Sequence, residues 1–326
     1  MTTHRKHRQA GRTLVELMIA LTIGLVIMLA VTALFITNNA SSRVSDDKTR
    51  LDEEGYLALN LIAFHIRMAG YGSLKKITPT GATEADQTLQ EAKMYTNFTG
   101  NSHGVNTNAI RGCANGFSNP AASAETVNCN SGTGSNAVLV RYVVDALSSN
   151  VSSGTGLPVD CLGAEITVNP AIDDDPAYFV ADNRFFVQTN PETQVPELYC
   201  LGNGGTSIGA TALANPAQPV AENVEKLIIN YGLSDNVDKK ANSQVVARFL
   251  PAEEMLTTGE SSLVNAEWNR VISARICIVV RSANNNITLR PQTYFGCDGK
   301  SVTANDRRLR GVFSTTVTIR NRTGVI

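Results

Sequence analysis

Twenty consecutive residues near the start of the chain, Leu17 to Ile36, include no charged residue and no proline. As an α-helix, with a rise of about 1.5 Å per residue, this run would be about 30 Å long, which matches the hydrocarbon core of a bilayer. We therefore predict a membrane-spanning helix over residues 14–36. The rest of the chain is then expected to fold on one side of that membrane.

The segment before this helix is short and basic, and it ends in a glycine, Gly11. Arg5, Lys6 and Arg8 lie in it without an acidic residue. The positive-inside rule therefore predicts a cytoplasmic N-terminus, with everything after Ile36 across the membrane. A secretory signal peptide has a shorter apolar stretch closed by a small-residue cleavage site, and neither feature is found here.

One carboxylate, Glu16, lies at the start of the apolar segment. A carboxylate in a membrane helix costs about 3 kcal/mol on insertion scales unless it has a partner, so we expect a cation beside it. In a helix that serves only as a signal anchor, Glu16 would lie at the head-group level next to Arg12.

The string GRTLVELM, Gly11 to Met18, resembles the class III leader of type IV prepilins and pseudopilins. The resemblance implies removal of residues 1–11 by a prepilin peptidase that cuts after Gly11. It also implies that Glu16, the fifth mature residue, pairs with the methylated N-terminal amine of a neighbouring subunit during filament assembly. Arg12 would be the first mature residue, where these proteins usually have Phe or Met, and this difference bears on the methylation of Arg12.

Composition bounds the part that follows the membrane helix. The 326 residues are 43% hydrophobic and 17% charged, enough for a sizeable core in one or two globular units. The formal charge of −1 becomes about −4 once the three basic side chains of the leader are removed. A mildly acidic chain has no general attraction for nucleic acid.

All six cysteines follow the apolar segment: Cys113, Cys129, Cys161, Cys200, Cys277 and Cys297. An even number in an exported domain favours disulfides. We favour pairing in sequence order because each such pair brackets a loop rich in Gly and Asn, while a reduced set of thiols remains the alternative. A metal site is less favoured, since no C-x-x-C occurs and cleavage would leave only His65 and His103 as imidazoles.

A second helical pattern follows the apolar run. Leu57, Leu61, Phe64 and Met68 recur at helical spacing, and a stripe of further apolar residues widens this face: Ala58, Ile62, Ile66 and Ala69. With no proline from residue 12 to 70, we expect one helix over 12–70, ended by Gly70 and Gly72, whose stripe packs on the domain that follows.

Beyond the helix, residues 73–135 are expected to form loops and short irregular pieces. Strands are expected over residues 137–144, 165–168, 184–189, 197–200, 226–232, 270–281, 287–295 and 311–320. The alternation in 270–281 predicts one buried face. The fold class is thus α+β and pilin-like: a long N-terminal helix packed on an antiparallel sheet domain, residues 71–326, with disulfide-tied loops.

Several strings are similar to the PilW family of type IV pilus minor pilins. They are EEGYLALNLIAFHIRMAGYGS from Glu53, the D-C-L-G of 160–163, the E-L-Y-C of 197–200, AENVEKLIINYG from Ala221, RICIVVRS from Arg275 and the ending RRLRGVFSTTVTIRNR. The resemblance implies a low-abundance subunit that helps to start pilus assembly and lies at or near the tip. Its implied partners are other minor pilins, a large tip adhesin, the major pilin and the assembly platform of the inner membrane.

Two other functions stay open. The ending also resembles the large pseudopilin of type II secretion, which builds a short periplasmic fibre from similar parts. The second is a membrane-anchored periplasmic binding or adhesive module with an uncleaved N-terminus.

An enzyme is not expected. Gly205 to Gly209 matches the G-x-S-x-G nucleophile pattern, but that order needs a histidine after Ser207, and the last histidine is His103. The run Gly299 to Ser301 is similar to the end of a phosphate loop, but Tyr294 occupies the position of its first glycine.

Two charged clusters have alternative interpretations. Asp173, Asp174 and Asp175 could bind calcium, although a solvated acidic turn is favoured, and no other cofactor is expected. The cluster of Arg307, Arg308 and Arg310 could contact DNA, but no aromatic residue interleaves with it. A solvated loop, or a contact with acidic groups of a partner, is favoured there.

Overall fold

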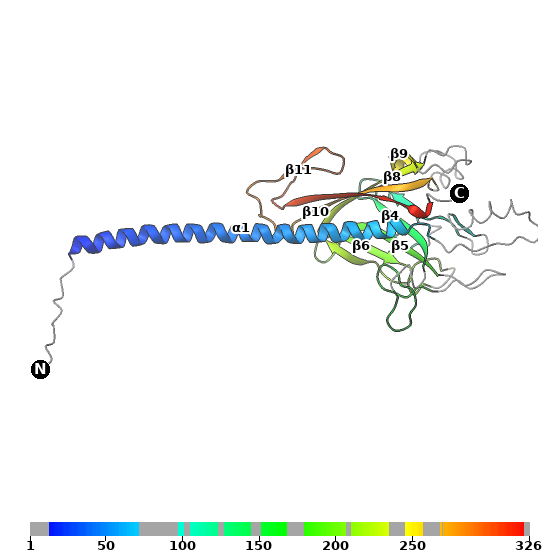
Figure 1. Cartoon of the computed structure of the whole chain (residues 1–326), viewed down its shortest axis with the longest axis horizontal. Helices are drawn as coiled ribbons and strands as arrows, with labels where there is room; N and C mark the ends of the chain where they lie inside the picture. Colours follow the sequence, from blue (N-terminus) through cyan, green and yellow to red (C-terminus); the bar gives the residue numbers. More distant parts are fainter. Residues whose placement is uncertain are drawn as a thin grey trace, which may run out of the picture. The chain divides into compact units, whose positions relative to one another are not determined.

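The computed structural model describes residues 13–71, 97–100, 105–122, 127–144, 151–167, 179–206, 210–234, 245–256, 268 and 270–322. The chain forms two compact units, residues 1–49 and 50–326. Helix α1, Leu14–Met68, runs through both, within the range expected from the sequence (Figure 1). Gly70 follows it with φ of 72°, a left-handed conformation that glycine adopts at helix ends without steric cost.

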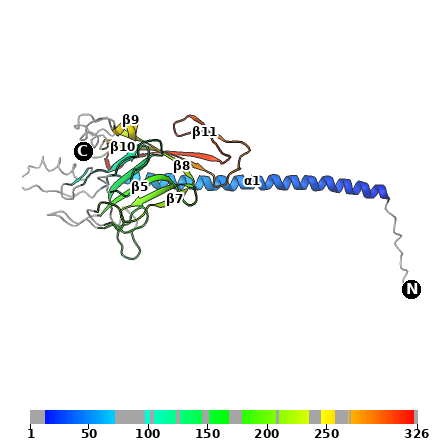
Figure 2. The same ribbon diagram turned by 180° about the vertical axis from the view of Figure 1, so that it is seen from behind.

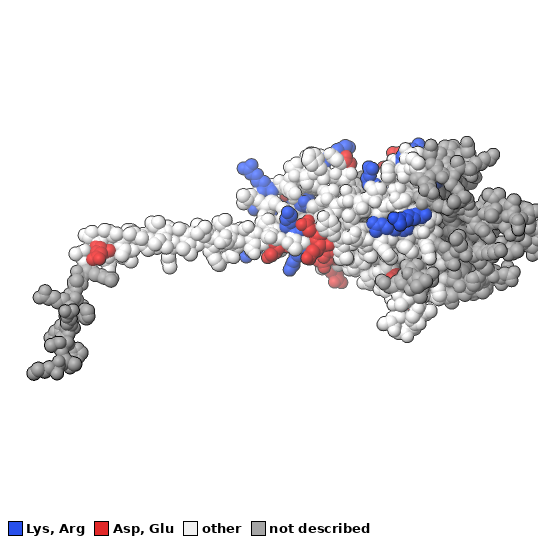
Figure 3. All heavy atoms as spheres, in the orientation of Figure 1, with Lys and Arg blue, Asp and Glu red and all other residues white. Residues whose placement is uncertain are grey.

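In the first unit, α1 is an apolar helix with its side chains exposed. Its most apolar 18-residue window has a mean hydropathy of 2.8, and none of it is buried. The hydroxyls of Thr22, Thr32 and Thr37 donate to helix carbonyls three or four residues earlier, at 2.8 to 2.9 Å. Each hydroxyl is thereby satisfied within the helix, as a lipid environment requires. Figure 3 shows this stretch as uncharged after one acidic group.

The second unit contains two large antiparallel sheets, with strand orders β3-β4-β5-β6-β7 and β13-β10-β8-β9. The strands of the first are β3 Ile110–Cys113, β4 Ala137–Val144, β5 Phe179–Thr189, β6 Pro196–Gly202 and β7 Gln218–Glu222. Those of the second are β8 Val224–Ser234, β9 Val246–Pro251, β10 Val271–Arg281 and β13 Arg310–Thr318. This architecture confirms the predicted α+β fold.

Smaller elements complete the second unit. Two hairpins pair β1 Asn97–Gly100 with β2 Val105–Asn108, and β11 Thr293–Phe295 with β12 Ser301–Thr303. A short helix, α3 Ala252–Leu256, follows β9, and a 3-10 turn, η1 Arg320–Arg322, follows β13.

The end of α1 and both large sheets share one core. The buried helix residues in this core are Leu51, Ala58, Leu59, Ile62, Ala63, Ile66 and Ala69. They pack with residues of β4, β5 and β6 from one sheet and of β8, β10 and β13 from the other. Figures 1 and 2, which view the chain from opposite sides, both show this part of the helix alongside the sheets.

The helix face that enters the core differs from the expected stripe. Leu57 and Phe64, placed at its centre by the sequence, are 54% and 47% exposed. The residues expected only to widen the stripe, such as Ala58 and Ile62, are fully buried instead. Small side chains decide the orientation, because Gly55 and Ala58 allow the strands to come close to the helix. A Cβ atom on Gly55 would overlap the ring of Phe313.

Three predictions of secondary structure, two of strands and one of an irregular segment, were wrong in part. The expected strand over 287–295 is limited to Thr293–Phe295, and it pairs with β12 and not with β10. Glu165 forms only an isolated bridge with Val159, and residue 168 lies outside the described residues. Residues 73–135 were expected to be irregular, yet β3 belongs to the five-stranded sheet, where it pairs with β4.

Strand β10 is buried more completely than its alternation predicts. Ser273, Cys277 and Val279 lie on the face expected to be exposed, and all three are buried. Within β10, Arg275 is the exposed position, and its guanidinium lies 4.6 Å from the centre of the Phe249 ring. Cys277 lies on this second face, and its disulfide joins the strand to Cys297.

The six cysteines form three disulfides, each between neighbours in the sequence. The bonds are Cys113–Cys129, Cys161–Cys200 and Cys277–Cys297, with Cα–Cα distances of 5.2, 6.5 and 5.8 Å. One cysteine of each bond lies in a strand: Cys113 in β3, Cys200 in β6 and Cys277 in β10.

Candidate functional site

The start of α1 places Glu16 in a defined local geometry. Thr13 precedes the helix, and its hydroxyl accepts a hydrogen bond from the backbone N–H of Glu16 at 3.3 Å. The carbonyl of Thr13 also accepts from the N–H of Leu17 at 3.2 Å. Thr13 is therefore the N-cap, and Glu16 lies in the first turn, where the helix dipole favours a negative charge.

Within residues 13–71, the Glu16 carboxylate makes no ion pair and no side-chain hydrogen bond. The cap uses only its backbone N–H, so the carboxylate is available to a partner. Gly11 and Arg12, the predicted processing residues, lie outside the described residues.

The D-C-L-G and E-L-Y-C strings meet in the structure, although they lie far apart in the sequence. Asp160 accepts hydrogen bonds from the backbone N–H groups of Leu162 at 2.8 Å, Ala164 at 3.0 Å and Gly204 at 2.8 Å. The disulfide Cys161–Cys200 joins the same two segments. Asp160 is buried, so these strings form a structural junction beside β6.

A buried polar cluster links α1 to the five-stranded sheet. Nδ1 of His65 lies 2.8 Å from the hydroxyl of Tyr142 on β4, and the amide of Asn183 on β5 donates to that hydroxyl at 3.2 Å. Burial lowers the pKa of His65 to about 4, and burial raises the pKa of Tyr142. At neutral pH both groups are therefore uncharged, and the cluster holds the helix to the sheet.

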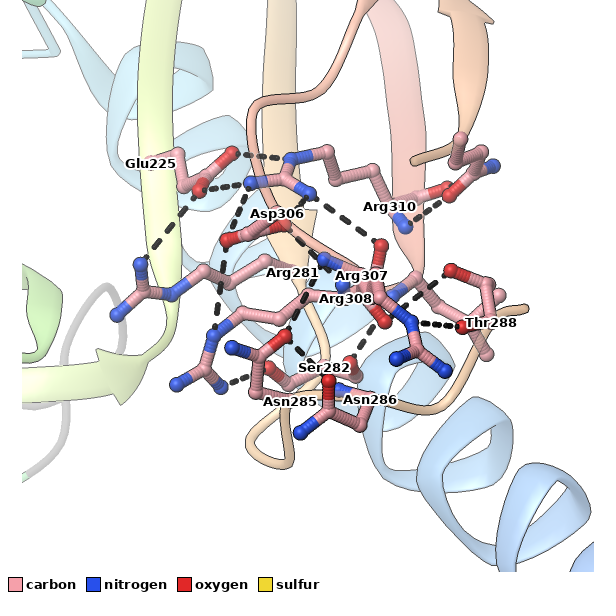
Figure 4. Close-up of polar contacts among 12 residues, drawn as sticks. Glu225, Arg281, Ser282, Asn285, Asn286, Thr288, Asp306, Arg307, Arg308 and Arg310 are labelled. Carbon is pink, nitrogen blue, oxygen red and sulfur yellow. Dashed lines mark hydrogen bonds and ion pairs between the residues drawn. The ribbon is translucent and has the colours of Figure 1, made fainter. Parts of the chain in front are cut away.

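The basic cluster near the C-terminus is internally paired, which corrects the expectation of a solvated loop. Arg310 is buried, and its guanidinium donates to both carboxylate oxygens of Glu225 at 3.0 Å (Figure 4). It also reaches Asp306 at 2.5 and 3.1 Å. The hydrogen bond from Arg310 lowers the pKa of Asp306 to about 2. Burial favours a lower pKa for Arg310, but its bonds to the two carboxylates outweigh burial and raise it.

The other two arginines of this cluster hold the segment between β10 and β13. Arg308 lies 3.8 Å from Asp306 and donates to the carbonyls of Ser282, at 2.8 Å, and Ala283. Nε of Arg307 donates to the carbonyl of Thr288 at 2.7 Å. Figure 4 shows Arg308 beside Asp306 and Arg310, and Arg307 turned toward Thr288, so both arginines help to fix this segment to the sheet.

The structure also bears on the enzyme-like patterns. Gly299 is in the turn of the β11–β12 hairpin with φ of 73°, and Ser301 begins β12 rather than a helix, so no phosphate loop forms there. Ser207 and the triplet Asp173, Asp174 and Asp175 lie outside the described residues. Across the described ranges, no group of three or more His, Cys, Asp or Glu side chains is arranged to hold a metal ion.

Sequence reasoning missed two side chains that organise the second unit. Glu225, the partner of Arg310, is 85 residues away from it along the chain. Asn321 donates from its side-chain amide to the carbonyls of Arg67 at 3.2 Å and Met68 at 3.4 Å, and so it caps the end of α1 from outside the helix. No local pattern in the sequence signals either contact.

Comparison with known proteins bears on both ends of the chain. Residues 6–32 match the prokaryotic N-terminal methylation motif. Together with the long apolar helix and the antiparallel sheets, this match makes the chain similar to type IV pilins, and it fits a membrane-anchored protein. More specifically, the chain is PilW-like: residues 184–321 match the family described as type IV pilus-assembly protein W.

Among solved structures, the chain is similar to a type IV-like pilin from Thermus thermophilus. The two are 9% identical, with a TM-score of 0.29, over 75% of this chain and 100% of the other. The fold is defined by its own helix, sheets and disulfides. No curated protein matches the chain.

Proposed function

We propose that the protein is a minor pilin of a type IV pilus, a structural subunit that helps to start pilus assembly and lies at or near the pilus tip. The observation that carries this proposal is the combination of two matches on one chain. A methylation motif covers the start of the apolar helix, and a PilW domain forms most of the C-terminal half. The proposed role needs no catalytic residue and no cofactor.

In this proposal, the prepilin peptidase removes residues 1–11, and Arg12 becomes the methylated N-terminal residue. The helix then joins the helices of other subunits, and Glu16 pairs with the N-terminal amine of a neighbour. The capped geometry supports this role, because the Glu16 carboxylate is not used by the described part of the helix. A partnered carboxylate avoids the cost of an isolated charge in the membrane.

The proposed topology follows from the charges of the leader. Its basic residues keep the N-terminus in the cytoplasm, and the disulfide-bonded unit lies in the periplasm before assembly. The proposed partners are other minor pilins, the major pilin, a tip adhesin and the inner-membrane assembly platform.

The substitution Glu16→Ala tests the assembly role. The variant is expected to be cleaved and to reach the membrane, but to be missing from sheared filament fractions. Glu16→Asp keeps the charge and is expected to retain measurable incorporation. Normal incorporation of Glu16→Ala would remove the proposed role of this carboxylate.

A deletion strain separates the alternatives. If surface pilin in sheared fractions disappears on deletion and returns on complementation, the protein is required for pilus assembly. If piliation is unchanged while secretion of type II substrates stops, the chain is a secretion pseudopilin. An uncleaved N-terminus, determined by sequencing the membrane form, would favour an anchored binding or adhesive module.

A further inference from the structure

Strand β13 is the outer strand of its sheet, and among the described strands none pairs with its other edge. Its described partner is β10, in a register that runs from Ser273 opposite Thr318 to Arg281 opposite Arg310. The carbonyl of Val317 accepts from the Ser273 hydroxyl at 2.9 Å, which places the odd-numbered residues toward β10. In an antiparallel pair, alternate residues point their backbone groups to opposite sides. The backbone groups of the even-numbered residues from 312 to 318 therefore point away from the sheet.

Arg310 is the first residue of this edge, and its outward backbone groups already have a partner within the chain. The side-chain amide of Gln292 accepts from the backbone N–H of Arg310 at 2.6 Å and donates to its carbonyl at 3.2 Å. Gln292 thereby occupies the place that a neighbouring strand would take. From Val312 to Thr318, the described part of the chain supplies no hydrogen bond to the outward backbone groups.

The β13 edge lacks the features that usually protect an outer strand. Residues 311–319, GVFSTTVTI, contain no charge and no proline. Exposed edges of this kind pair readily with another chain unless charge, proline or short length prevents it.

The outer strands at the three other edges of the two large sheets are protected. Strand β9 contains Arg248 and ends at Pro251. Strand β7 has five residues, including Pro219, and β3 has four, including Arg111. Of the edges in the two large sheets as described, only that of β13 has a stretch as long as residues 311–318 without a charged residue or a proline.

A groove of about 760 Å³ runs along the far half of this edge. Its walls come from the end of α1 and from the last residues of β13: Arg67, Met68, Tyr71, Thr316, Val317, Thr318, Arg320 and Asn321. Alternate side chains of a strand added to β13 would enter this groove. The lining combines apolar surface from Met68 and Tyr71 with the exposed Arg67, and it contains no carboxylate. Figure 3 shows basic groups on the face that carries the end of α1.

We propose that the free edge of β13 is a docking site for an extended segment of a different subunit, which adds to the sheet as a further strand. The basic groove selects a segment with acidic side chains on the face turned toward α1. Backbone hydrogen bonds supply the affinity, and the groove supplies the selectivity, as in other cases of strand addition. The inference rests on the proposed function only in taking the partner to be a subunit of the same assembly.

Proline at position 316 tests the backbone part of the proposal. Thr316→Pro removes one outward N–H and leaves the bonds to β10 in place, which edge strands tolerate. Thr316→Val is the matched control, because it keeps the N–H and a high strand propensity. Each change is combined with a photo-cross-linking amino acid in place of Tyr71, in the full-length protein, in cells that carry the complete pilus system.

The expected result is a cross-link to an acidic, extended segment of another subunit, identified by mass spectrometry. Thr316→Pro should weaken the cross-link by about tenfold, as the loss of a backbone hydrogen bond and of strand register predicts, whereas Thr316→Val should not. A cross-link that survives Thr316→Pro overturns the proposal. So does a cross-link that maps to a second copy or to this chain itself.

A second pair of variants tests the charge of the groove at an exposed residue, where a substitution should leave folding intact. Arg67 is exposed, so Arg67→Glu reverses the charge of the groove without touching the core, and Arg67→Lys keeps it. The cross-link should fall with Arg67→Glu alone, and an unchanged yield contradicts the predicted acidic partner. The cross-link is read independently of piliation, so a deletion strain that keeps its pili would overturn the proposed function but not the docking site.

Discussion

The guanidinium of Arg310 on β13 meets the carboxylate of Glu225 on β8 with two hydrogen bonds of 3.0 Å, across the intervening strand β10 (Figure 4). The Arg310 side chain is 4% exposed, and Asp306 is its second acidic partner. One buried cation thus joins β13 to β8 and to the segment that precedes β13.

Removing this cation should destabilise the second unit strongly. Arg310→Met removes the hydrogen bonds to Glu225 and Asp306 and leaves these carboxylates only the longer contacts with Arg281 at 3.7 Å and Arg308 at 3.8 Å. The expected loss is about 1–3 kcal/mol of unfolding free energy. Arg310→Lys keeps the charge but not the two-pronged geometry, and should lose less. Denaturant unfolding of the full chain in detergent measures both. Lys300→Met is the control, since its ion pair with Asp298 is exposed, and its stability should equal that of the parent.

Acid should destabilise the fold through His65. Burial lowers its folded-state pKa to about 4 from an ordinary value of 6.5, so the unfolded chain binds more protons between these values. The contribution to stability is complete above pH 6.5 and is lost as pH falls toward 4. At about 1.4 kcal/mol per pKa unit, the total is about 3 kcal/mol.

The measurement is the thermal midpoint of the full chain in detergent at pH 7 and pH 4.5. His65→Gln removes the titrating group, so its midpoint should change less between the two pH values than that of the parent. Equal pH dependence in both proteins would show that another group carries the acid sensitivity.

Whether Gly55→Ala stabilises or destabilises the protein should depend on Phe313. Alanine is favoured over glycine in a helix by about 1 kcal/mol, but a Cβ at position 55 would overlap the ring of Phe313. Gly55→Ala alone should therefore destabilise the protein. In a Phe313→Ala background the overlap is absent, and the same change should stabilise it by about 1 kcal/mol. A double-mutant cycle on unfolding free energies tests this inversion, and additive effects would contradict the close packing.

The elements fixed by local patterns were predictable from the sequence. The apolar run and the absence of proline indicate the helix that the structure places at Leu14–Met68. The β-branched run of residues 137–144 coincides with β4. Alternation in residues 270–281 locates β10, because the side-chain period of two is a property of the strand itself.

Features that depend on distant residues were not predictable in this way. The stripes that contain Leu57 and Ala58 are both apolar, and only the packing of small residues against two sheets decides which of them is buried. The arginines near residue 308 look solvated because Glu225, which pairs with one of them, is remote in sequence. Likewise, β3 is too short to show a period and becomes a strand through its pairing with β4.

The disulfide pattern has a consequence for how the protein could be made. The bonds join the first cysteine of the chain to the second, the third to the fourth and the fifth to the sixth. In a chain that crosses the membrane from its N-terminal side, every bridge can close when its second cysteine emerges, before the next pair arrives. Oxidation in order of emergence then yields the native bonds, and maturation would require a thiol oxidase but no isomerase to exchange mispaired cysteines.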